Sequence, residues 1–276
     1  MFRNFSFGLM LIIGSLIWSQ EIITTTSLQL NGKVKQVETY QVEYEEVFGK
    51  YEEKSKKQIS IMKFDSKGYL SQNDDQKKTQ IYSYDSSDKL LTLSVSYKEN
   101  NSTQKNEVRK YKYSNSNEYE TEIYNDKNVL IKKEVSKRNN PLQEDIIVYD
   151  QSGKQSSKRI YYFDNNGNRI KAEIIDKNGT KTMTTEQEYD LKNNLINTKI
   201  ETSSGISYYE ENEILNNLIQ KNIVKSNFSE DTISVYNYEL DSQNNWIKKT
   251  FYIIKNEFGE DKKILQKSEI RVIEYF

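Results

Sequence analysis

Apolar and polar residues alternate along most of this chain, and short polar clusters interrupt the alternation at similar intervals. The clearest cluster is Phe163-Asp164-Asn165-Asn166-Gly167-Asn168-Arg169, and nine stretches between Phe64 and Trp246 are variants of it. Each variant has an aromatic or aliphatic residue, then Asp, Asn or Ser, two free positions, and then Gly, Asn or Asp. Alternation with a period of two is typical of half-buried strands. The pattern therefore predicts a long run of antiparallel β-hairpins.

The residue types in these clusters match the backbone that a tight turn requires. Asp, Asn or Ser at the first position can accept hydrogen bonds from amides of the turn. The fourth position must be left-handed to form a bulged turn, which Gly adopts freely and Asn or Asp tolerate. The fourth residues are Gly68, Asp88, Asn117, Asn128, Gly153, Gly167, Gly179, Asn193 and Asn244.

Such a turn also predicts which residues face one another. With Asp164 opposite Asn168, Phe163 should face Arg169, and Tyr162 should face Ile170 one position further out. The same rule pairs Phe64 with Leu70, Ile81 with Leu93, Tyr84 with Leu90, Ile123 with Ile131, Tyr124 with Leu130, Ile160 with Ala172, Tyr189 with Leu195 and Leu240 with Trp246.

The predicted fold is all-β, a long antiparallel meander of hairpins. The most regular part runs from about residue 144 to 201. Asn31-Gly32 is predicted to be a two-residue turn between strands Ile22–Leu30 and Lys33–Glu46. Glu210–Leu218 has helical spacing, but its surroundings favour a strand, and one strand is predicted over Ile214–Ser226. Roughly sixteen to eighteen strands should form an open sheet that curls or rolls instead of staying flat.

Composition supports a folded but poorly apolar sheet. The chain has 276 residues, of which 35% are hydrophobic, and its mean hydropathy is −0.88. It has 21 Tyr and 10 Phe, whereas disordered chains are poor in aromatic residues. Tyr buries a ring and keeps its hydroxyl wet, which suits a thin sheet. The 40 basic and 41 acidic residues nearly cancel, so no nucleic-acid partner is expected.

Residues 1–20 differ from the rest. Arg3 precedes a mostly apolar stretch from Phe5 to Trp18. This stretch is too short to span a bilayer and is typical of a secretory signal peptide, with an uncleaved anchor as the alternative. We expect residues 21–276 to form one elongated β-hairpin repeat domain. The chain has no Cys, so an exported product without disulfides indicates a bacterial periplasmic, cell-surface or secreted location.

Several chemistries are excluded by residue type. Without His or Cys the chain has no imidazole or thiol catalysis and no usual zinc site. The Asp164 and Asp176 turns contain many oxygen groups, but an EF-hand loop needs Glu at its twelfth position, where Ile175 and Gln187 stand. No metal and no cofactor are therefore expected. Carboxylate pairs such as Glu43 with Glu45, or Glu186 with Glu188, leave a glycosidase mechanism open.

Aromatic residues suggest contact surfaces. Tyr161, Phe163 and Arg169 are predicted to share one strand face and form the best candidate ligand-contact patch. The chain ends in Tyr275-Phe276, as outer-membrane barrels often do. Such barrels need an apolar outward band, whereas the predicted strands carry charges on both faces. We therefore expect no membrane insertion after signal removal.

The phrases Phe163-Asp164-Asn165-Asn166-Gly167-Asn168-Arg169 and Tyr149-Asp150-Gln151-Ser152-Gly153-Lys154 resemble the YD repeats of bacterial Rhs-like proteins. They are also similar to short exported YD-like proteins of Bacteroidetes-type bacteria. The likeness covers about Phe64 to Trp246. In that family tandem hairpins build a curled β-shell, so the resemblance implies a strip of hairpins exposed outside the cytoplasm.

These observations together predict a non-enzymatic exported binding or structural module of a bacterial cell envelope. Its partner would be a protein or a glycan, contacted through Tyr-rich faces and edge strands. The alternative is a carbohydrate-active hydrolase that uses paired carboxylates.

Overall fold

The computed structural model describes residues 23–98 and 106–276, and over these ranges it contains strands and turns and no helix. The all-β, antiparallel prediction is confirmed. The predicted signal peptide lies outside the described residues. The strands are β1 (Val34–Val47), β2 (Lys50–Phe64), β3 (Leu70–Asp75), β4 (Lys78–Tyr84), β5 (Leu90–Tyr97), β6 (Glu107–Tyr113), β7 (Glu118–Asn125), β8 (Leu130–Asn140), β9 (Gln143–Asp150), β10 (Gln155–Phe163), β11 (Arg169–Asp176), β12 (Lys181–Tyr189), β13 (Leu195–Thr202), β14 (Ser207–Leu215), β15 (Leu218–Ser226), β16 (Ser229–Leu240), β17 (Trp246–Glu257) and β18 (Glu260–Tyr275).

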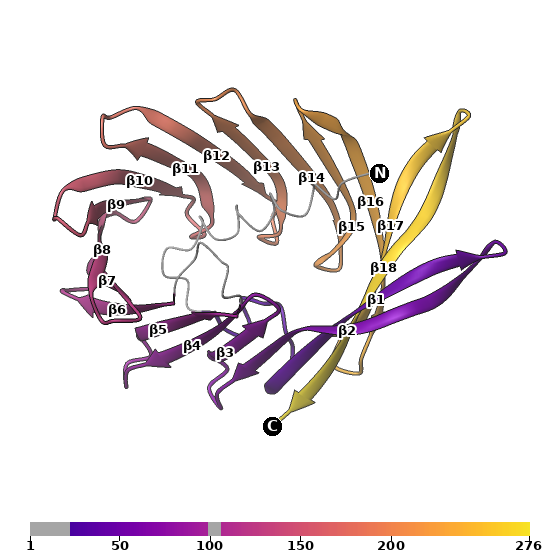
Figure 1. Ribbon diagram of the computed structural model, residues 1–276, viewed down its shortest axis with the longest axis horizontal. Coiled ribbons are helices and arrows are strands. Elements are labelled where there is room, and N and C mark those ends of the chain that lie inside the picture. The colour runs from indigo at the N-terminus through magenta and orange to yellow at the C-terminus, as the bar shows by residue number, and fades with distance from the viewer. Residues whose placement is uncertain (1–22, 99–105) are drawn as a thin grey trace.

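The sheet is closed, which corrects the prediction of an open curled sheet. Each strand pairs antiparallel with the next, and β18 also pairs with β1, from Val34 opposite Tyr275 to Glu43 opposite Lys267. All eighteen strands therefore belong to one antiparallel barrel. Figure 1 shows the ring, with the first and last strands side by side. Closure leaves no free sheet edge, so the predicted contacts through edge strands do not apply to the ring itself.

Besides the left-handed residue of the turn itself, most hairpins contain a further β-bulge after the first residue pair, and this bulge bends the sheet. Phe163 faces Arg169 as predicted, but Tyr162 faces Lys171, so Ile170 is an extra residue. The same shift follows the first pair at seven further turns, and the extra residues are Ser71, Leu91, Ile131, Ser156, Thr182, Ile196 and Ile247. Because a bulge increases strand bending and twist, repeating it at hairpin after hairpin curves the sheet toward closure.

The bulges divide the predicted pairs into two groups. The pair next to each turn is confirmed for Phe64–Leu70, Tyr84–Leu90, Tyr124–Leu130, Phe163–Arg169, Tyr189–Leu195 and Leu240–Trp246. Pairs further from the turn were wrong by one residue: Tyr161, not Ile160, faces Ala172, Tyr82 faces Leu93, and Lys132 faces Ile123. A one-residue slip reverses which face the partner strand presents.

The turn chemistry is as predicted at eight of the nine positions, where φ is positive. In the turn at Asp164, the carboxylate Oδ1 accepts the backbone N–H groups of Asn166 (2.9 Å) and Asn168 (2.8 Å). Asn117 is the exception, since its φ is not positive and the hairpin β6–β7 has no register shift. A further turn of this kind at Thr202–Ile206, with Gly205 left-handed, was not among the nine.

Two predictions about the connections were wrong. Residues 23–30 form turns and one isolated bridge, Thr24 with Tyr69, in place of a strand paired across Asn31-Gly32. This segment packs against Val37, Phe64 and Leu70, where apolar contacts favour it. The predicted strand over Ile214–Ser226 is interrupted by a two-residue turn at Asn216 and Asn217, whose φ values of 53° and 61° suit Asn.

The two faces of the sheet differ in burial. On β9, Glu144, Ile146 and Val148 are buried, while the residues between them are partly exposed. In a closed ring side chains crowd on the concave side, so this buried set faces inward. The outward face carries ion pairs of opposite charge: Lys112–Glu122, Lys133–Glu120, Lys158–Asp145, Lys171–Glu173, Lys199–Glu201, Lys221–Glu213 and Lys248–Glu239.

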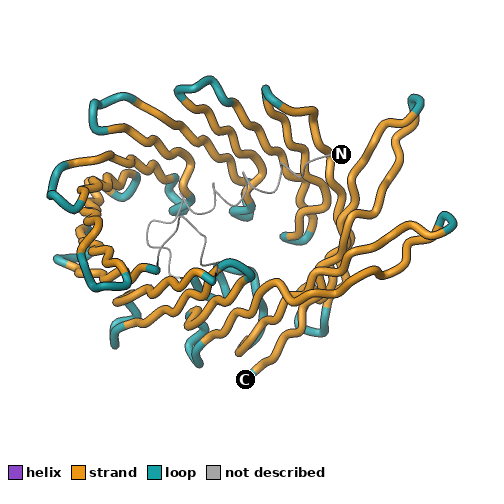
Figure 2. The backbone as a smooth tube through the Cα atoms, viewed as in Figure 1, coloured by secondary structure: helices purple, strands orange, loops and turns teal. Residues whose placement is uncertain are grey.

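The meander gives the barrel two rims. Turns that follow even-numbered strands lie at one end, here called rim A, and include Asp85–Lys89, Ser114–Glu118 and Asp164–Asn168. Turns that follow odd-numbered strands lie at the other end, called rim B. Figure 2 shows these turns along the two borders of the strand layer. On rim A, Asn side chains connect successive turns: the Nδ2 of Asn168 donates to Asn193 (2.9 Å) and that of Asn194 to Asn217 (3.3 Å).

Candidate ligand-binding pocket

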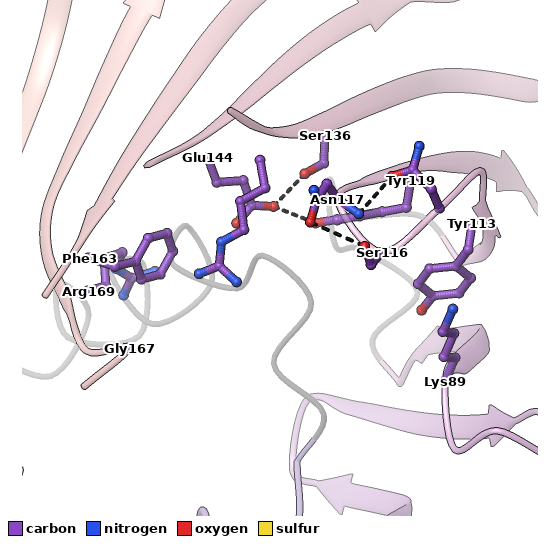
Figure 3. Close-up of a pocket in the computed structure, with 12 residues that line it drawn as sticks. Lys89, Tyr113, Ser116, Asn117, Tyr119, Ser136, Glu144, Phe163, Gly167 and Arg169 are labelled. Atoms are coloured by element: carbon purple, nitrogen blue, oxygen red, sulfur yellow. Dashed lines mark hydrogen bonds between the residues drawn. The ribbon is translucent and has the colours of Figure 1, made fainter. Parts of the chain in front are cut away.

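A pocket of about 320 Å³ opens at rim A between the turns that follow β4, β6 and β10. Its lining is polar, charged and aromatic. Figure 3 shows Lys89 and Tyr113 on one side and Phe163 and Arg169 on the other. The lining residues are Lys89, Tyr113, Asn115, Ser116, Asn117, Tyr119, Ser136, Arg138, Glu144, Phe163, Gly167 and Arg169.

The pocket lies where the turn pattern of rim A is broken at two successive hairpins. The β6–β7 turn lacks the left-handed residue at Asn117, and the β8–β9 turn is shortened to Pro141 and Leu142. The Tyr before a rim A turn binds the preceding hairpin: the hydroxyl of Tyr84 donates to the carbonyl of Leu70 (2.8 Å), Tyr113 to Leu90 (2.9 Å) and Tyr189 to Arg169 (3.3 Å).

Phe163 holds the corresponding position before the β10–β11 turn. It has no hydroxyl, and its backbone N–H donates to the carbonyl of Leu142 in the short turn (2.9 Å). Its ring therefore makes no tyrosine-type bond to the preceding hairpin and lines the pocket instead. The short turn and the Phe together leave space that a regular hairpin would fill.

Cations cover aromatic rings in this pocket. The guanidinium of Arg138 lies 4.8 Å from the centroid of the Phe163 ring, and the ammonium of Lys89 lies 4.9 Å from that of Tyr113. Both cationic side chains belong to exposed residues, and neither has a carboxylate within ion-pair distance in the described part of the chain. Cations held over rings are positioned but still available to an anion.

Arg169 is held more firmly. Its guanidinium lies 5.3 Å from the Tyr161 ring centroid, and its Nε donates to Oε1 of Gln187 (3.4 Å). It therefore contributes positive charge to the wall from a fixed position.

Glu144 is the one carboxylate among the lining residues, and it is buried, with 9% of its surface exposed. It accepts hydrogen bonds from the hydroxyls of Tyr119 (3.2 Å) and Ser136. Burial, and then the charge of Glu144, raise the pKa of Tyr119, so this hydroxyl stays a donor at neutral pH. Glu144 thus fixes the pocket floor, and the exposed charge of the pocket is positive.

The inner wall behind the pocket is also charged and paired. Arg159 Nη2 lies 2.6 Å from Glu134 Oε1, and Lys132 Nζ lies at the same distance from it. Burial disfavours the charged carboxylate, but Arg159 and Lys132 outweigh burial and lower the pKa of Glu134. The pair stays ionised at neutral pH and connects β8 to β10 across β9.

The three residues predicted as a contact patch are brought together but play different parts. Phe163 and Arg169 line the pocket. Tyr161 is 2% exposed and packs with Ile146 and Val148, so its ring lies beneath the surface. Sequence reasoning missed Lys89, Arg138 and Glu144. The one signal of this pocket in the sequence was the irregular turn spacing around Pro141, and it indicated a loop without indicating a binding site.

The proposed carboxylate pairs do not meet in a recess. Glu43, Glu45, Glu186 and Glu188 are exposed. Glu43 accepts from Ser55, Glu45 pairs with Lys54 at 3.8 Å, and Glu188 accepts from Asn197. Among the described residues no group of three or more carboxylates is arranged to hold a metal ion. Within the same ranges no helix is long and apolar enough to cross a bilayer.

No protein-family model and no curated protein sequence matches this chain. Among solved structures, it is similar to a porin-like protein from Bacteroides uniformis ATCC 8492, with 10% identity and a TM-score of 0.48, over 88% of this chain and 99% of that one. Two further structures, TcdB2-TccC3-Cdc42 and TcdB2-TccC3-TEV, give TM-scores of 0.27 and 0.23 at 10% and 12% identity. In both, the match covers 82% of this chain and 15% of the other. At these scores no property of those proteins is transferred to this one.

Proposed function

We propose that this protein is a non-enzymatic, exported binding module of a bacterial cell envelope, and that the rim A pocket takes an acidic sugar of a glycan. The observation that carries the proposal is the placement of Arg138 and Lys89 over aromatic rings at the mouth of a polar recess. Aromatic faces stack on sugar rings, and unpaired cations bind carboxylate or sulfate groups.

The size and lining of the recess favour a sugar. A volume of about 320 Å³ lies at the lower end of the range for small-molecule sites and suits one ring and not an extended ligand. Asn115, Ser116 and Asn117 offer amide and hydroxyl groups for the many hydroxyls of a sugar. An acidic peptide side chain would use the cations but would leave these polar groups without partners.

The outer wall supports a barrel that stays in water. Its ion pairs, such as Lys133–Glu120 at 2.8 Å and Lys158–Asp145 at 2.8 Å, stand where a membrane-embedded barrel would need apolar residues. Export and the relationship to YD-repeat proteins rest on the sequence alone and belong to the same proposal. Fractionation of the host's cells, with the protein followed through cytoplasm, periplasm, surface and medium, tests export. Recovery of the full-length chain in the cytoplasm would contradict it.

Binding is tested with purified acidic oligosaccharides, such as oligogalacturonate, beside their neutral counterparts, by calorimetry. We expect binding of the acidic form that weakens as salt rises. Arg138→Gln should reduce affinity about tenfold, the usual value of a charge-assisted hydrogen bond. Lys137→Gln is the matched control because this adjacent residue is exposed on the opposite face.

Three results would overturn the proposal. The first is an absence of binding to any acidic sugar, and the second is an equal loss in the Arg138 and Lys137 variants. The third is binding of acidic peptides in preference to sugars. Hydrolysis of the oligosaccharide that Glu144→Gln abolishes would instead favour the hydrolase. The pocket gives little support to that alternative, since a two-carboxylate mechanism needs a second acidic group and Glu144 is alone among the lining residues.

A further inference from the structure

Three consecutive hairpin tips on rim B each present a phenylalanine to solvent. These residues are Phe228 between β15 and β16, Phe258 between β17 and β18, and Phe48 between β1 and β2. Their exposed fractions are 57%, 103% and 102%. Because β18 pairs with β1, the three hairpins follow one another around the ring. We call them the three Phe tips.

The other described tips of rim B are polar. Their central residues are Gln76 and Lys77, Asp126 and Lys127, Gln151 and Ser152, Lys177 and Asn178, and Ser203 and Ser204. The aromatic residues are therefore gathered in one sector of the rim and are not a general feature of its turns.

Two of the tips adopt a backbone that does not favour phenylalanine. Phe48 has φ 50° and Phe258 has φ 57°, and a left-handed Gly follows each of them. Two-residue turns of this type prefer Asn or Gly at the first position, and a bulky side chain there is unusual. The comparable turn on rim A uses Asn216 and Asn217. Two Phe residues thus combine an unfavourable backbone conformation with a fully exposed ring. Because neither ring stabilises the fold by packing, we infer that they have a role outside it.

The hairpins that carry Phe48 and Phe258 extend beyond the barrel wall. The β1–β18 pairing stops at Glu43 opposite Lys267, and β2 pairs with β3 only from Ser60 onward. Beyond those points the β1–β2 hairpin is a free two-stranded arm, and residues 50–58 of β2 are all exposed. On the other hairpin, β17 pairs with β16 as far as Ile254, so its free arm is shorter and begins at Lys255 opposite Lys262. Figure 1 shows both arms projecting from the same side of the ring. Among the described residues nothing covers their tips.

We propose that the three Phe tips insert into the surface of a lipid bilayer and hold the barrel against it by rim B. A fluid bilayer accepts separate apolar side chains wherever they arrive, whereas a protein partner would need three matching sockets. The barrel wall remains in water, so this is a peripheral contact.

Charged residues on the two arms indicate whether the bilayer must carry anionic headgroups. Both signs stand close to the tips and pair with one another, as in Lys54–Glu45 at 3.8 Å and Lys262–Glu257 at 2.8 Å. Phe258 is followed by Glu260 and Asp261, which an anionic surface would repel. The attachment is therefore hydrophobic, and zwitterionic headgroups are sufficient for it.

The test is flotation of the purified protein with vesicles of phosphatidylcholine, and with vesicles that also contain phosphatidylglycerol. We expect binding to both that survives about 0.5 M salt, at which attraction between surface charges is largely screened. Changing Phe48 and Phe258 to Asn together should reduce partitioning about tenfold or more, on the scale of partial burial of two Phe side chains. Asn suits a left-handed position, so the variant should fold at least as stably as the wild type.

Leu191→Asn is the matched control. Leu191 is 105% exposed in a rim A turn, so the same substitution removes an exposed apolar side chain from the opposite end of the barrel. The proposal is overturned if wild-type protein does not float with either vesicle, or if Leu191→Asn loses as much binding as the Phe variant. It is also overturned if binding needs the anionic lipid and disappears with salt, or if the Phe tips prove to mediate dimers in solution. The sugar-binding assay is independent of these outcomes.

Discussion

Asn31 and Asn245 are joined by two hydrogen bonds although 214 positions separate them in the chain. The backbone N–H of Asn31 donates to Oδ1 of Asn245 (2.7 Å), and Nδ2 of Asn245 donates back to the carbonyl of Asn31 (2.9 Å). The same Nδ2 donates to the hydroxyl of Tyr275 (2.7 Å). One buried amide thus connects the segment that precedes β1, the β16–β17 turn and the end of β18 at the seam of the barrel.

Removing this amide should loosen the seam. Asn245→Ala leaves the N–H and C=O of Asn31 without these partners, and we expect the free energy of unfolding to fall by about 2 kcal/mol. Chemical denaturation measures the loss. Asn166→Ala is the control because the side chain of Asn166 is exposed and its backbone N–H keeps the bond to Asp164. Equal effects at the two positions would contradict the role given to Asn245.

The turn aspartates should make the barrel sensitive to acid. The side chain of Asn168 lowers the pKa of Asp164, the backbone N–H of Thr180 that of Asp176, and the side chain of Asn194 that of Asp190. A carboxylate whose folded pKa is depressed stabilises the fold above its unfolded pKa of about 3.9. That contribution is lost as pH falls through the depressed folded value. We expect the denaturation midpoint to drop steeply below about pH 4.

Asp164→Asn tests this reasoning. The turn at Asn125 shows that an amide oxygen can accept the same two backbone N–H groups, here from Lys127 (3.0 Å) and Val129 (2.9 Å). The variant should therefore fold but show a shallower loss of stability between neutral and acid pH. A denaturation series over pH measures the slope. The control is Asp126→Asn, a substitution at the residue that follows Asn125 in the β7–β8 turn. An unchanged slope in Asp164→Asn would argue against the linkage.

The tyrosine that precedes a rim A turn should stabilise the neighbouring hairpin through its hydroxyl. Tyr84→Phe removes the 2.8 Å bond to the carbonyl of Leu70 and should cost about 1 kcal/mol. Thermal and denaturant unfolding give the value. Tyr162→Phe is the control, because Tyr162 faces outward and no residue in the described ranges bonds its hydroxyl. A cost at Tyr162 as large as that at Tyr84 would show that the ring substitution itself is responsible.

Left-handed glycines of the turns should resist a side chain for backbone reasons alone. Gly153 and Gly179 have φ of 79° and 83°, and an added Cβ would meet no atom within 4 Å. We expect Gly153→Ala and Gly179→Ala to cost about 1 kcal/mol each, and the corresponding Asn variants to cost less. Asn117 is not left-handed, so Asn117→Gly should bring no gain. Stability curves for the set decide this, and a gain at Asn117 would contradict the turn geometry.

The partly buried pair Glu134–Arg159 should be costly to break by removing only the arginine. Arg159→Met removes one of the two cations that lie 2.6 Å from Glu134 Oε1 and leaves Lys132 as the other. We expect a cost of about 2 kcal/mol at neutral pH, the usual value of a hydrogen bond to a charged group. The double variant with Glu134→Gln should recover part of that loss, because the neutral amide no longer needs the second cation. A double-mutant cycle in denaturant measures the coupling, and additive losses would contradict it.

Local chemistry made the hairpins predictable. An Asp or Asn, two free residues and a left-handed residue define a turn within four positions, so Gly167 and Asn193 could be recognised without knowing the fold. The pair next to each turn, such as Tyr84 with Leu90, follows from the same turn pattern. Adjacent apolar residues after the turn, as in Leu130-Ile131, were a signal of the extra bulge that strict alternation overlooked.

The candidate site was only partly predictable. Phe163 and Arg169 lie on either side of one turn, so their proximity was local. Arg138 and Lys89 reach the same pocket from β8 and from the β4–β5 turn, and no spacing in the sequence connects them. The pocket exists because the β6–β7 and β8–β9 turns depart from the regular turn pattern. These departures create a recess only when the barrel places the two hairpins side by side.

The amino-acid sequence by itself determined where the chain reverses, because the backbone conformation of a turn depends on a few adjacent residues. It also determined that strands alternate between an apolar and a polar side. Tertiary structure alone decided that β18 returns to β1, that residues 23–30 fold against Phe64 and Leu70, and which face of each strand turns inward. These outcomes depend on bulges that add up around the ring and on contacts between residues more than two hundred positions apart, such as Asn31 and Asn245.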